Sequence, residues 1–215
     1  MSVDQQTWRR LVRTGLTGLD PQQVCPGYIC YSPYNGDGNG RGVTFLLDME
    51  GNEVHRWHLP TPPGSWGYLL PSGNLFYMAK AEQTNERQMP ASNFVGGWLL
   101  EVDWDSNIVW DYRDPLLHHD FERLANGNTL VLLWEKLPEE LAAKVSGGFS
   151  AGTTKGQMLG DTVREVTPGG ETVNEWRSWE FLSLEEDVIC PLEGRLEWTH
   201  QNCLNITEYG DLLVS

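Results

Sequence analysis

Apolar and polar residues alternate along residues 98–136, and short polar turns interrupt the alternation twice. The first interruption is Asp105-Ser106-Asn107 and the second is Asn126-Gly127-Asn128. Alternation with a period of two indicates strands with one buried face, and Asn-Gly turns between such runs indicate β-hairpins. We therefore predict two consecutive hairpins. Four short strands in about forty residues match the size of one β-propeller blade.

The same unit recurs before and after this stretch. Residues 48–57 (DMEGNEVHRW) and 167–176 (TPGGETVNEW) match residues 103–112, and the three copies end on Trp57, Trp176 and Tyr112. The second half of the unit recurs at 70–75 and 207–212. Three copies, at about 42–80, 97–136 and 161–215, predict an all-β fold, a β-propeller with short helical inserts. We expect the three matching aromatic residues to pack between blades.

The remaining segments complete the predicted organisation. Residues 1–26 are predicted to form a helix and linker, and 27–215 an incomplete propeller domain. Residues 138–145 begin with proline and two glutamates, which is typical of a short helix, and 178–198 form an insert in the third copy. Aligning the turn glycines places Ser215 within a strand, and three blades leave sheet edges unpaired. We therefore expect further copies of the repeat beyond Ser215.

The net charge of −15 narrows the range of partners. It argues against nucleic acid or an anionic membrane as the main partner, and an anionic substrate requires a local cationic pocket. The first residues lack the apolar run of a secretory signal, and no segment approaches the length of a membrane span, so we predict a cytoplasmic protein. The four cysteines show no CxxC spacing, which favours reduced thiols over disulfides or a zinc site.

Candidate chemistry lies in two histidine-containing segments, 117–120 (LHHD) and 198–202 (WTHQN). Counting back from the turn glycines aligns His119 with Asn202. Residues two apart in a strand share a face, so His200 and Asn202 are expected to point the same way. We expect His119 to join them from the neighbouring blade at the mouth of a central channel, while His118 points elsewhere.

Other interpretations of these histidines stay open. They are equally compatible with ordinary polar residues that line a wet channel. A zinc or copper site is disfavoured, because adjacent His118 and His119 cannot both face one ion on a regular strand, and no HExxH motif accompanies them. His55 and His58 are interpreted as surface or packing histidines. The loop at 35–40 (NGDGNG) resembles the start of a calcium loop but lacks its final glutamate, so we interpret it as a turn.

Six segments resemble the bacterial arylsulfotransferase family. They are GYICYSPYNGDG (27–38), WGYLLPSGNLFY (66–77), LLEVDWDSNIVWDYRDP (99–115), HHDFERLANGNTLVL (118–132), WEKLPEELAAKV (134–145) and ICPLEGRLEWTHQN (189–202). The resemblance implies a six-bladed propeller that moves a sulfuryl group from an aryl sulfate to a phenol through a sulfo-histidine. It implies no nucleotide donor, no other cofactor and no metal.

The resemblance also implies roles for particular residues. Through their position in the His-x-Asn motif, His200 and Asn202 are expected to hold the sulfuryl oxygens. The His-His-Asp run implies a similar role for one of its histidines, and strand alternation favours His119 over His118. The resemblance places the nucleophilic histidine beyond Ser215, so we expect residues 1–215 alone to be inactive.

The implied partners are a small-molecule aryl sulfate and a phenol. Candidates for stacking on the aryl ring are Tyr28, Tyr31, Trp66 and Tyr68, although a core role is favoured for each. Two alternatives to an enzyme of this class are a non-catalytic propeller that binds a partner on one rim, and a propeller that holds a quinone cofactor or a metal.

Overall fold

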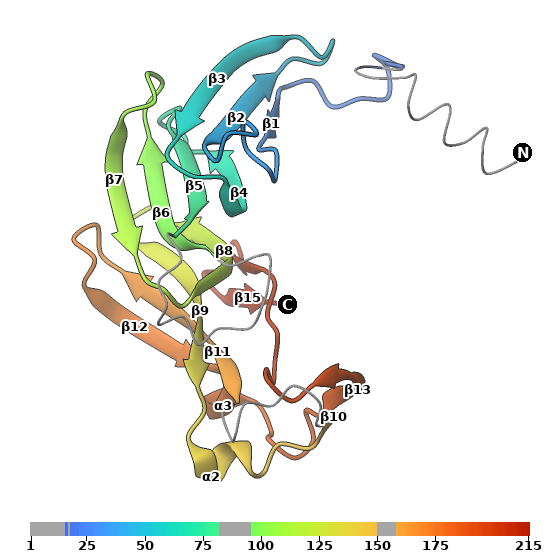
Figure 1. Ribbon diagram of the computed structural model, residues 1–215, viewed down its shortest axis with the longest axis vertical. Helices are drawn as coiled ribbons and strands as arrows, with labels where there is room; N and C mark the ends of the chain where they lie inside the picture. Colours follow the sequence, from blue (N-terminus) through green and yellow to red (C-terminus); the bar gives the residue numbers. More distant parts are fainter. Residues whose placement is uncertain (1–15, 17, 82–95, 150–157) are drawn as a thin grey trace, which may run out of the picture. The chain divides into compact units, whose positions relative to one another are not determined.

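The structure, a computed structural model, describes residues 16, 18–81, 96–149 and 158–215. Strands account for 49% of it and helices for 5%, so the all-β prediction is confirmed. The chain divides into two compact units, Met1–Pro62 and Pro63–Ser215, whose strands are labelled in Figure 1. The predicted helix at the N-terminus lies largely outside the described residues.

The first unit contains one antiparallel sheet. Its strands, in order, are β1 (Ile29–Tyr31), β2 (Gly42–Leu47) and β3 (Glu53–Leu59). The predicted hairpin at 48–57 is confirmed, because Asp48 caps the turn between β2 and β3. Its Oδ1 accepts the backbone N–H groups of Glu50 at 3.0 Å and Asn52 at 2.8 Å.

The second unit contains two four-stranded antiparallel sheets and a further hairpin. The first sheet is β4 (Pro63–Leu69), β5 (Leu75–Lys80), β6 (Gly97–Val102) and β7 (Ile108–Arg113). The second, in spatial order, is β12 (Thr172–Arg177), β11 (Leu159–Val166), β9 (Thr129–Lys136) and β8 (Leu117–Arg123). The hairpin is β14 (Leu204–Ile206) and β15 (Leu212–Val214).

Each predicted repeat is divided between two sheets. Residues 97–136 contribute β6 and β7 to the first four-stranded sheet and β8 and β9 to the second. A sheet therefore runs from the second hairpin of one repeat to the first hairpin of the next. The pairing of β5 with β6 and of β9 with β11 crosses the predicted repeat boundaries. Sequence similarity gave the period of the repeat but not the strand at which a sheet begins.

Six turns within the described residues close with the same pair of backbone hydrogen bonds. The N–H of the first residue donates to the carbonyl four residues later, and the N–H of the fourth residue donates to the carbonyl of the first. These turns begin at Asp48, Leu70, Asp103, Leu124, Thr167 and Thr207. The fourth position has positive φ; it is glycine in five turns and Ser106 in the other. Glycine adopts this conformation without a Cβ penalty, which explains its recurrence.

The sheet formed by β8, β9, β11 and β12 is covered on both faces. Val131 and Leu133 of β9 belong to a core shared with the first four-stranded sheet. Leu130 and Leu132 belong to a second core shared with β14 and β15. Strand β9 is thus buried on both sides, where the sequence pattern predicted one buried face. A strand covered on both faces needs a continuous apolar run, which TLVLLW supplies.

The aromatic residues at the matching repeat positions pack in the protein interior. Tyr112 packs against the first core and Trp176 against the second. Their predicted position between propeller blades stays a prediction. Trp57 is fully buried within the first unit. The aromatic residue that ends each repeat hairpin is therefore part of the packing.

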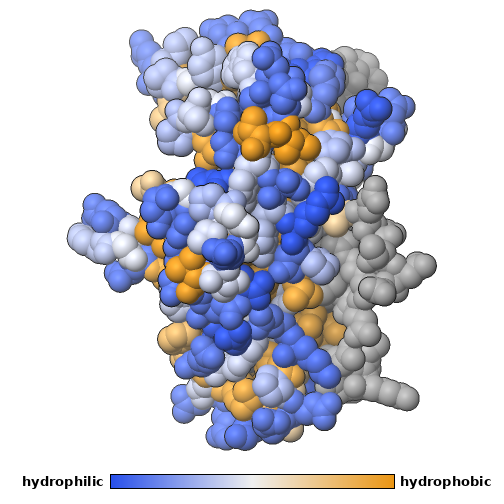
Figure 2. Space-filling view, turned by 90° about the vertical axis from the view of Figure 1, so that its left-hand side faces the viewer, coloured by the Kyte–Doolittle hydropathy of each residue, from blue (hydrophilic) through white to orange (hydrophobic). Residues whose placement is uncertain are grey.

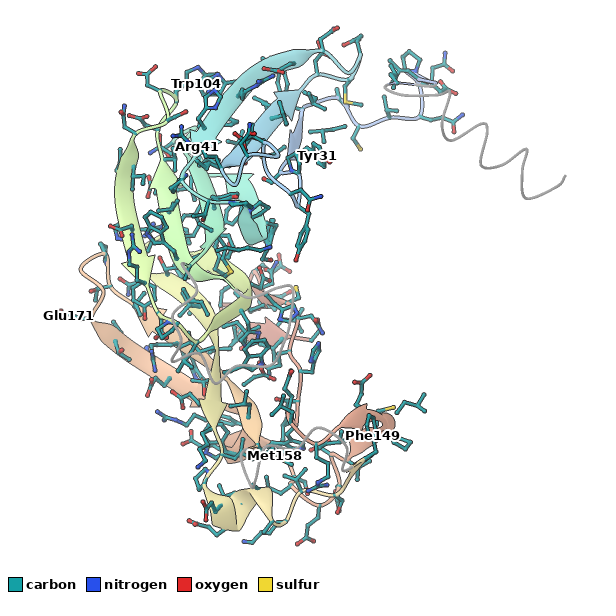
Figure 3. All side chains as sticks on the ribbon, viewed as in Figure 1. Tyr31, Arg41, Trp104, Phe149, Met158 and Glu171 are labelled. Atoms are coloured by element: carbon teal, nitrogen blue, oxygen red, sulfur yellow. The ribbon has the colours of Figure 1, made fainter. Side chains whose placement is uncertain are left out.

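Two insertions interrupt the second four-stranded sheet and the segment after it. They contain α2 (Glu139–Ala142), β10 (Gly147–Phe149), α3 (Ser178–Phe181) and β13 (Ile189–Gly194). The helix α2 follows Pro138, as predicted. Strands β10 and β13 pair in parallel. Met158, just before β11 and labelled in Figure 3, belongs to one buried cluster with Ile189 and Trp198. This packing fixes the start of the segment that carries His200.

The surface is mainly polar. Figure 2 shows a face on which hydrophilic residues dominate and hydrophobic ones form small separate patches. No helix in the described part of the chain is long and apolar enough to cross a membrane. All four cysteines are free thiols. The predicted compartment stays a prediction.

Candidate functional site

The site is assembled from β8 and from the segment between β13 and β14. His118 and His119 lie on β8, and His200 and Asn202 lie just before β14. The pairing of β8 with β9 shifts register between Leu117 and Phe121, and His119 has a left-handed φ of 44°. The histidine pair therefore sits on an irregular part of the strand.

This irregularity overturns the expectation that His118 and His119 point to opposite sides. The two Nδ1 atoms lie 2.9 Å apart, and the rings meet edge to face. A regular strand would separate neighbouring side chains, but the register shift and the positive φ turn them together. The argument against a shared site based on strand alternation is therefore wrong.

His118 is completely buried. Its ring stacks on Trp134 of β9, with ring centroids 4.2 Å apart and planes inclined by 10°. Its Nε2 lies 3.1 Å from Oδ1 of Asp161, which is within ion-pair distance, although the angle at the proton is not that of a hydrogen bond. His118 thus reaches a buried carboxylate on one side and His119 on the other.

Asp161 was not among the residues that the sequence indicated. It lies on β11 and is 1% exposed. Its Oδ2 accepts hydrogen bonds from the hydroxyl of Thr199 and from the backbone N–H of Gln201, the latter at 2.8 Å. Asp161 therefore holds the segment on both sides of His200. The strand reads LGDTVREV, so Asp161 is one of four polar residues in β11 and no sequence signal singled it out.

His119 is half-buried, and its ring centroid lies 5.4 Å from that of His200. Loss of hydration lowers the pKa of His119 to about 4, and the neighbouring charges of His118 and His200 act in the same direction. Its imidazole is neutral at pH 7. The backbone carbonyl of His119 accepts a hydrogen bond from the Ser65 hydroxyl on β4. The structure thus brings together His119 and His200, as the sequence predicted.

His200 is exposed and has a left-handed φ of 51°. Its Nδ1 lies 2.6 Å from a carboxylate oxygen of Glu197, a second residue that sequence reasoning missed. The contact places a proton on Nδ1, because a carboxylate accepts and does not donate. Glu197 therefore orients the ring of His200.

Asn202 does not share a strand face with His200. Residues 201–203 are outside any strand, and β14 begins at Leu204. The Asn202 side chain donates a hydrogen bond to the backbone carbonyl of His200 at 2.9 Å. The alternation argument fails here because the segment is bent rather than extended. In this geometry the amide supports the backbone that carries His200.

The third member of the His-His-Asp run has a structural function. Asp120 is 4% exposed, and its Oδ1 accepts the indole N–H of Trp66 and the backbone N–H of Phe121, both at 2.9 Å. Its Oδ2 accepts the backbone N–H of Leu204 at 2.8 Å. Asp120 thereby ties β8 to β4 and β14, the elements on either side of the site.

The candidate aryl-stacking residues separate into two groups. Trp66 and Tyr68 pack against Phe121, and the Tyr68 hydroxyl accepts the backbone N–H of Arg123 at 2.9 Å. Tyr28 and Tyr31 belong to the first unit and are exposed. Of the four, only Tyr68 has the core role expected for each, while Trp66 is partly exposed and anchored through Asp120.

A hollow of about 550 Å³ adjoins His200. Its walls include Ile189, Cys190, Glu193, Leu196, Glu197 and His200. This volume lies within the range of small-molecule sites. A second hollow of about 740 Å³ lies against Trp176, Trp198 and Ser215, and no histidine lines it. Space for a ligand is therefore available beside His200, whereas His119 does not line this hollow.

Within the described ranges, no group of three or more His, Cys, Asp or Glu residues could hold a metal ion. His119 and His200 supply two nitrogen ligands, and the nearby Glu197 carboxylate is engaged with Nδ1 of His200. In the 35–40 loop, the Asp37 carboxylate accepts the backbone N–H groups of Asn39 at 2.7 Å and Arg41 at 3.2 Å. That loop is a self-capped turn.

Comparison with known proteins assigns no family. No family model matches the chain, and no curated protein matches it. Among solved structures, the chain resembles a protein of unknown function from Bacteroides caccae, with 17% identity and a TM-score of 0.39. The match covers 88% of this chain and 53% of that one, so this chain spans about half of that protein's length. We base no assignment on this likeness.

Proposed function

We propose that His119 and His200 form part of a site that binds an aryl sulfate and transfers its sulfuryl group to a phenol. One observation carries the proposal: the two imidazoles come from distant segments of the sequence, their ring centroids lie 5.4 Å apart, and a hollow of about 550 Å³ adjoins His200. The resemblance of the surrounding segments to arylsulfotransferases supplies the reaction.

Electrostatics supports this choice of ligand. A protein with a net charge of −15 repels an anionic sulfate ester unless local donors compensate. In this proposal His200 provides such a donor when it is doubly protonated, because its Nδ1–H is directed at Glu197 and its Nε2–H is then left for the sulfuryl oxygen. Transfer of a sulfuryl group, like that of a phosphoryl group, depends chiefly on positioning and on stabilisation of charge on the non-bridging oxygens.

The proposal includes a β-propeller as the architecture of the whole protein. Its support is that two four-stranded antiparallel sheets and the β14–β15 hairpin follow one another along the chain, and each packs on the one before it. Their hairpins are closed by the same type of turn. Crystallography of the full gene product tests it. A set of sheets arranged around a common axis is expected, and an open stack of sheets contradicts it.

The reaction is tested with p-nitrophenyl sulfate on the full product of the gene, with and without added phenol. We expect nitrophenol release that depends on phenol. The release should fall at least about a hundredfold in His200→Ala, in line with the loss of one charge-stabilising donor. The matched control is His58→Ala, which removes an exposed histidine on β3 and should leave the rate unchanged.

The other outcomes separate the rival functions. A folded full-length protein that releases no nitrophenol is a binding module. Release that is independent of phenol identifies a hydrolase. Unchanged phenol-dependent release in His200→Ala contradicts the assignment of the site while leaving the reaction in place.

A further inference from the structure

A buried chain of polar contacts leads from Asp161 through His118 to His119. The Asp161 carboxylate and the His118 ring are 1% and 0% exposed, and the Oδ1–Nε2 distance is 3.1 Å. The Nδ1 atoms of His118 and His119 follow at 2.9 Å. Water cannot replace a partner of the buried Asp161 and His118, so the protons on the His118 nitrogens must match the groups that face them.

The first proton is fixed by Asp161. The contact between Nε2 of His118 and Oδ1 of Asp161 is not a linear hydrogen bond, but at 3.1 Å the carboxylate is close enough to favour a proton over a lone pair on Nε2. Nε2 of His118 therefore carries a proton. The other oxygen of Asp161 accepts hydrogen bonds from Thr199 and Gln201 and so carries no proton itself.

The second proton follows from the first. A neutral imidazole has one donor and one acceptor nitrogen, so a neutral His118 that is protonated at Nε2 accepts at Nδ1. His119 must then donate from its own Nδ1 across the 2.9 Å contact. The lone pair of His119 consequently lies on Nε2. A neutral His118 meets both contacts without a further charge in a fully buried position.

We propose that Asp161, acting through His118, is a positioning group that holds His119 in its Nδ1–H tautomer, so that Nε2 of His119 is a hydrogen-bond acceptor. This inference rests on the proposed function, and the Nδ1–H tautomer changes the role that His119 has in that function. Its Nε2 accepts a hydrogen bond from the hydroxyl of the acceptor phenol and orients it, instead of donating to a sulfuryl oxygen. His200 keeps the contact with the sulfuryl group.

The same logic predicts the effect of an isosteric change. In Asp161→Asn, the amide oxygen can keep the hydrogen bonds from Thr199 and Gln201, which turns the NH₂ group toward His118. Nε2 of His118 then becomes the acceptor, its Nδ1 becomes the donor, and His119 changes to the Nε2–H tautomer. Replacing the buried Asp of a Ser-His-Asp triad by Asn likewise leaves the geometry but selects the wrong tautomer.

The tautomer is measured directly by two-bond ¹H–¹⁵N spectra of histidine-labelled full-length protein at pH 7. Each histidine signal, including those of the five histidines in residues 1–215, is assigned with a variant that lacks that one histidine. We expect His119 with a protonated Nδ1 in the wild type and a protonated Nε2 in Asp161→Asn. The matched control is Glu165→Gln, another buried carboxylate on β11, which accepts from Asn128 and Asn174 and should leave the tautomer unchanged.

His118→Phe serves if Asp161→Asn does not fold. The phenyl ring can keep the stacking on Trp134 but offers no acceptor to His119, so the preference for the Nδ1–H tautomer should be lost. A wild-type His119 protonated at Nε2, a doubly protonated His118, or a tautomer unaffected by Asp161→Asn overturns the inference. None of these outcomes depends on activity.

Kinetics tests the assigned role. We expect Asp161→Asn to raise the KM for the acceptor phenol about tenfold, the effect of one lost hydrogen bond, with a smaller change in nitrophenol release at saturating phenol. An equal fall in kcat and in kcat/KM, with no rise in the KM for phenol, contradicts a phenol-orienting role. If no aryl sulfate is turned over, the proposed function fails while the spectra still decide the tautomer.

Discussion

His119 and His200 both have a left-handed backbone conformation, with φ of 44° and 51°, and their ring centroids lie 5.4 Å apart. Such φ values are unusual for residues other than glycine, asparagine and aspartate and carry strain. Around His119 the strand register also shifts. Both backbone irregularities therefore occur at the point where the two imidazoles meet.

Backbone strain at His200 can be measured by comparing two substitutions. His200→Ala and His200→Gly both remove the contact with Glu197, but only glycine adopts a φ of 51° without a Cβ penalty. We expect the glycine variant to be more stable than the alanine variant by roughly 0.5–1 kcal/mol in urea unfolding. Equal stability, or a more stable alanine variant, means that the backbone at His200 is unstrained.

The lowered pKa of His119 predicts a loss of stability in mild acid. In the unfolded chain His119 takes up a proton near pH 6.5, whereas in the folded protein its pKa is about 4. Between these values the unfolded state binds more protons, so the free energy of unfolding falls as the pH is lowered through this window. Above about pH 7 this contribution is absent.

Denaturant unfolding at pH 7 and pH 5 tests this relation. We expect the wild type to lose more stability between the two pH values than His119→Gln, which has no imidazole to titrate. The difference between the two proteins gives the contribution of His119 to the pH dependence of the free energy of unfolding, separate from that of the other titrating groups. An identical loss in both proteins indicates that the pKa of His119 is not lowered.

Asp120 is expected to be a stability residue. Asp120→Ala leaves the backbone N–H groups of the buried Phe121 and Leu204, and the indole N–H of the partly exposed Trp66, without their acceptor. Loss of hydrogen bonds to a buried charged acceptor should lower the free energy of unfolding by about 3 kcal/mol. Asp211→Ala, at an exposed turn, is the control and should change stability by less than about 0.5 kcal/mol. A near-neutral Asp120→Ala contradicts the bridging role.

The repeated turns predict a pair of opposite effects. Ser106 occupies the position of positive φ that is glycine in the other five turns. Ser106→Gly should stabilise the protein, and Gly127→Ser, at the equivalent position with φ of 89°, should destabilise it, each by roughly 0.5–1 kcal/mol. Thermal or urea unfolding of the two variants provides the comparison. Effects of the same sign contradict the equivalence of the turns.

The sequence by itself determined the features that depend on neighbouring residues. The hairpins were predicted from the turn residues at 103–107 and 124–128 and from the alternating residues on either side of each turn. This succeeds because a tight turn and its two strands are specified by neighbouring residues. The recurrence of that pattern gave the all-β class. The alignment through the turn glycines also brought His119 and His200 into one site, because equivalent positions of packed repeats lie close together.

The tertiary structure decided everything that depends on pairing between distant segments. It determined that β5 pairs with β6 and β9 with β11, so that sheets cross the repeat boundaries. It also produced the irregular backbone at His119, which follows from the register of β8 against β9. Asp161 meets His118 only because β11 lies beside β9 in the folded sheet. Strand alternation assumes a regular extended chain, and the residues of this site lie where the backbone departs from it.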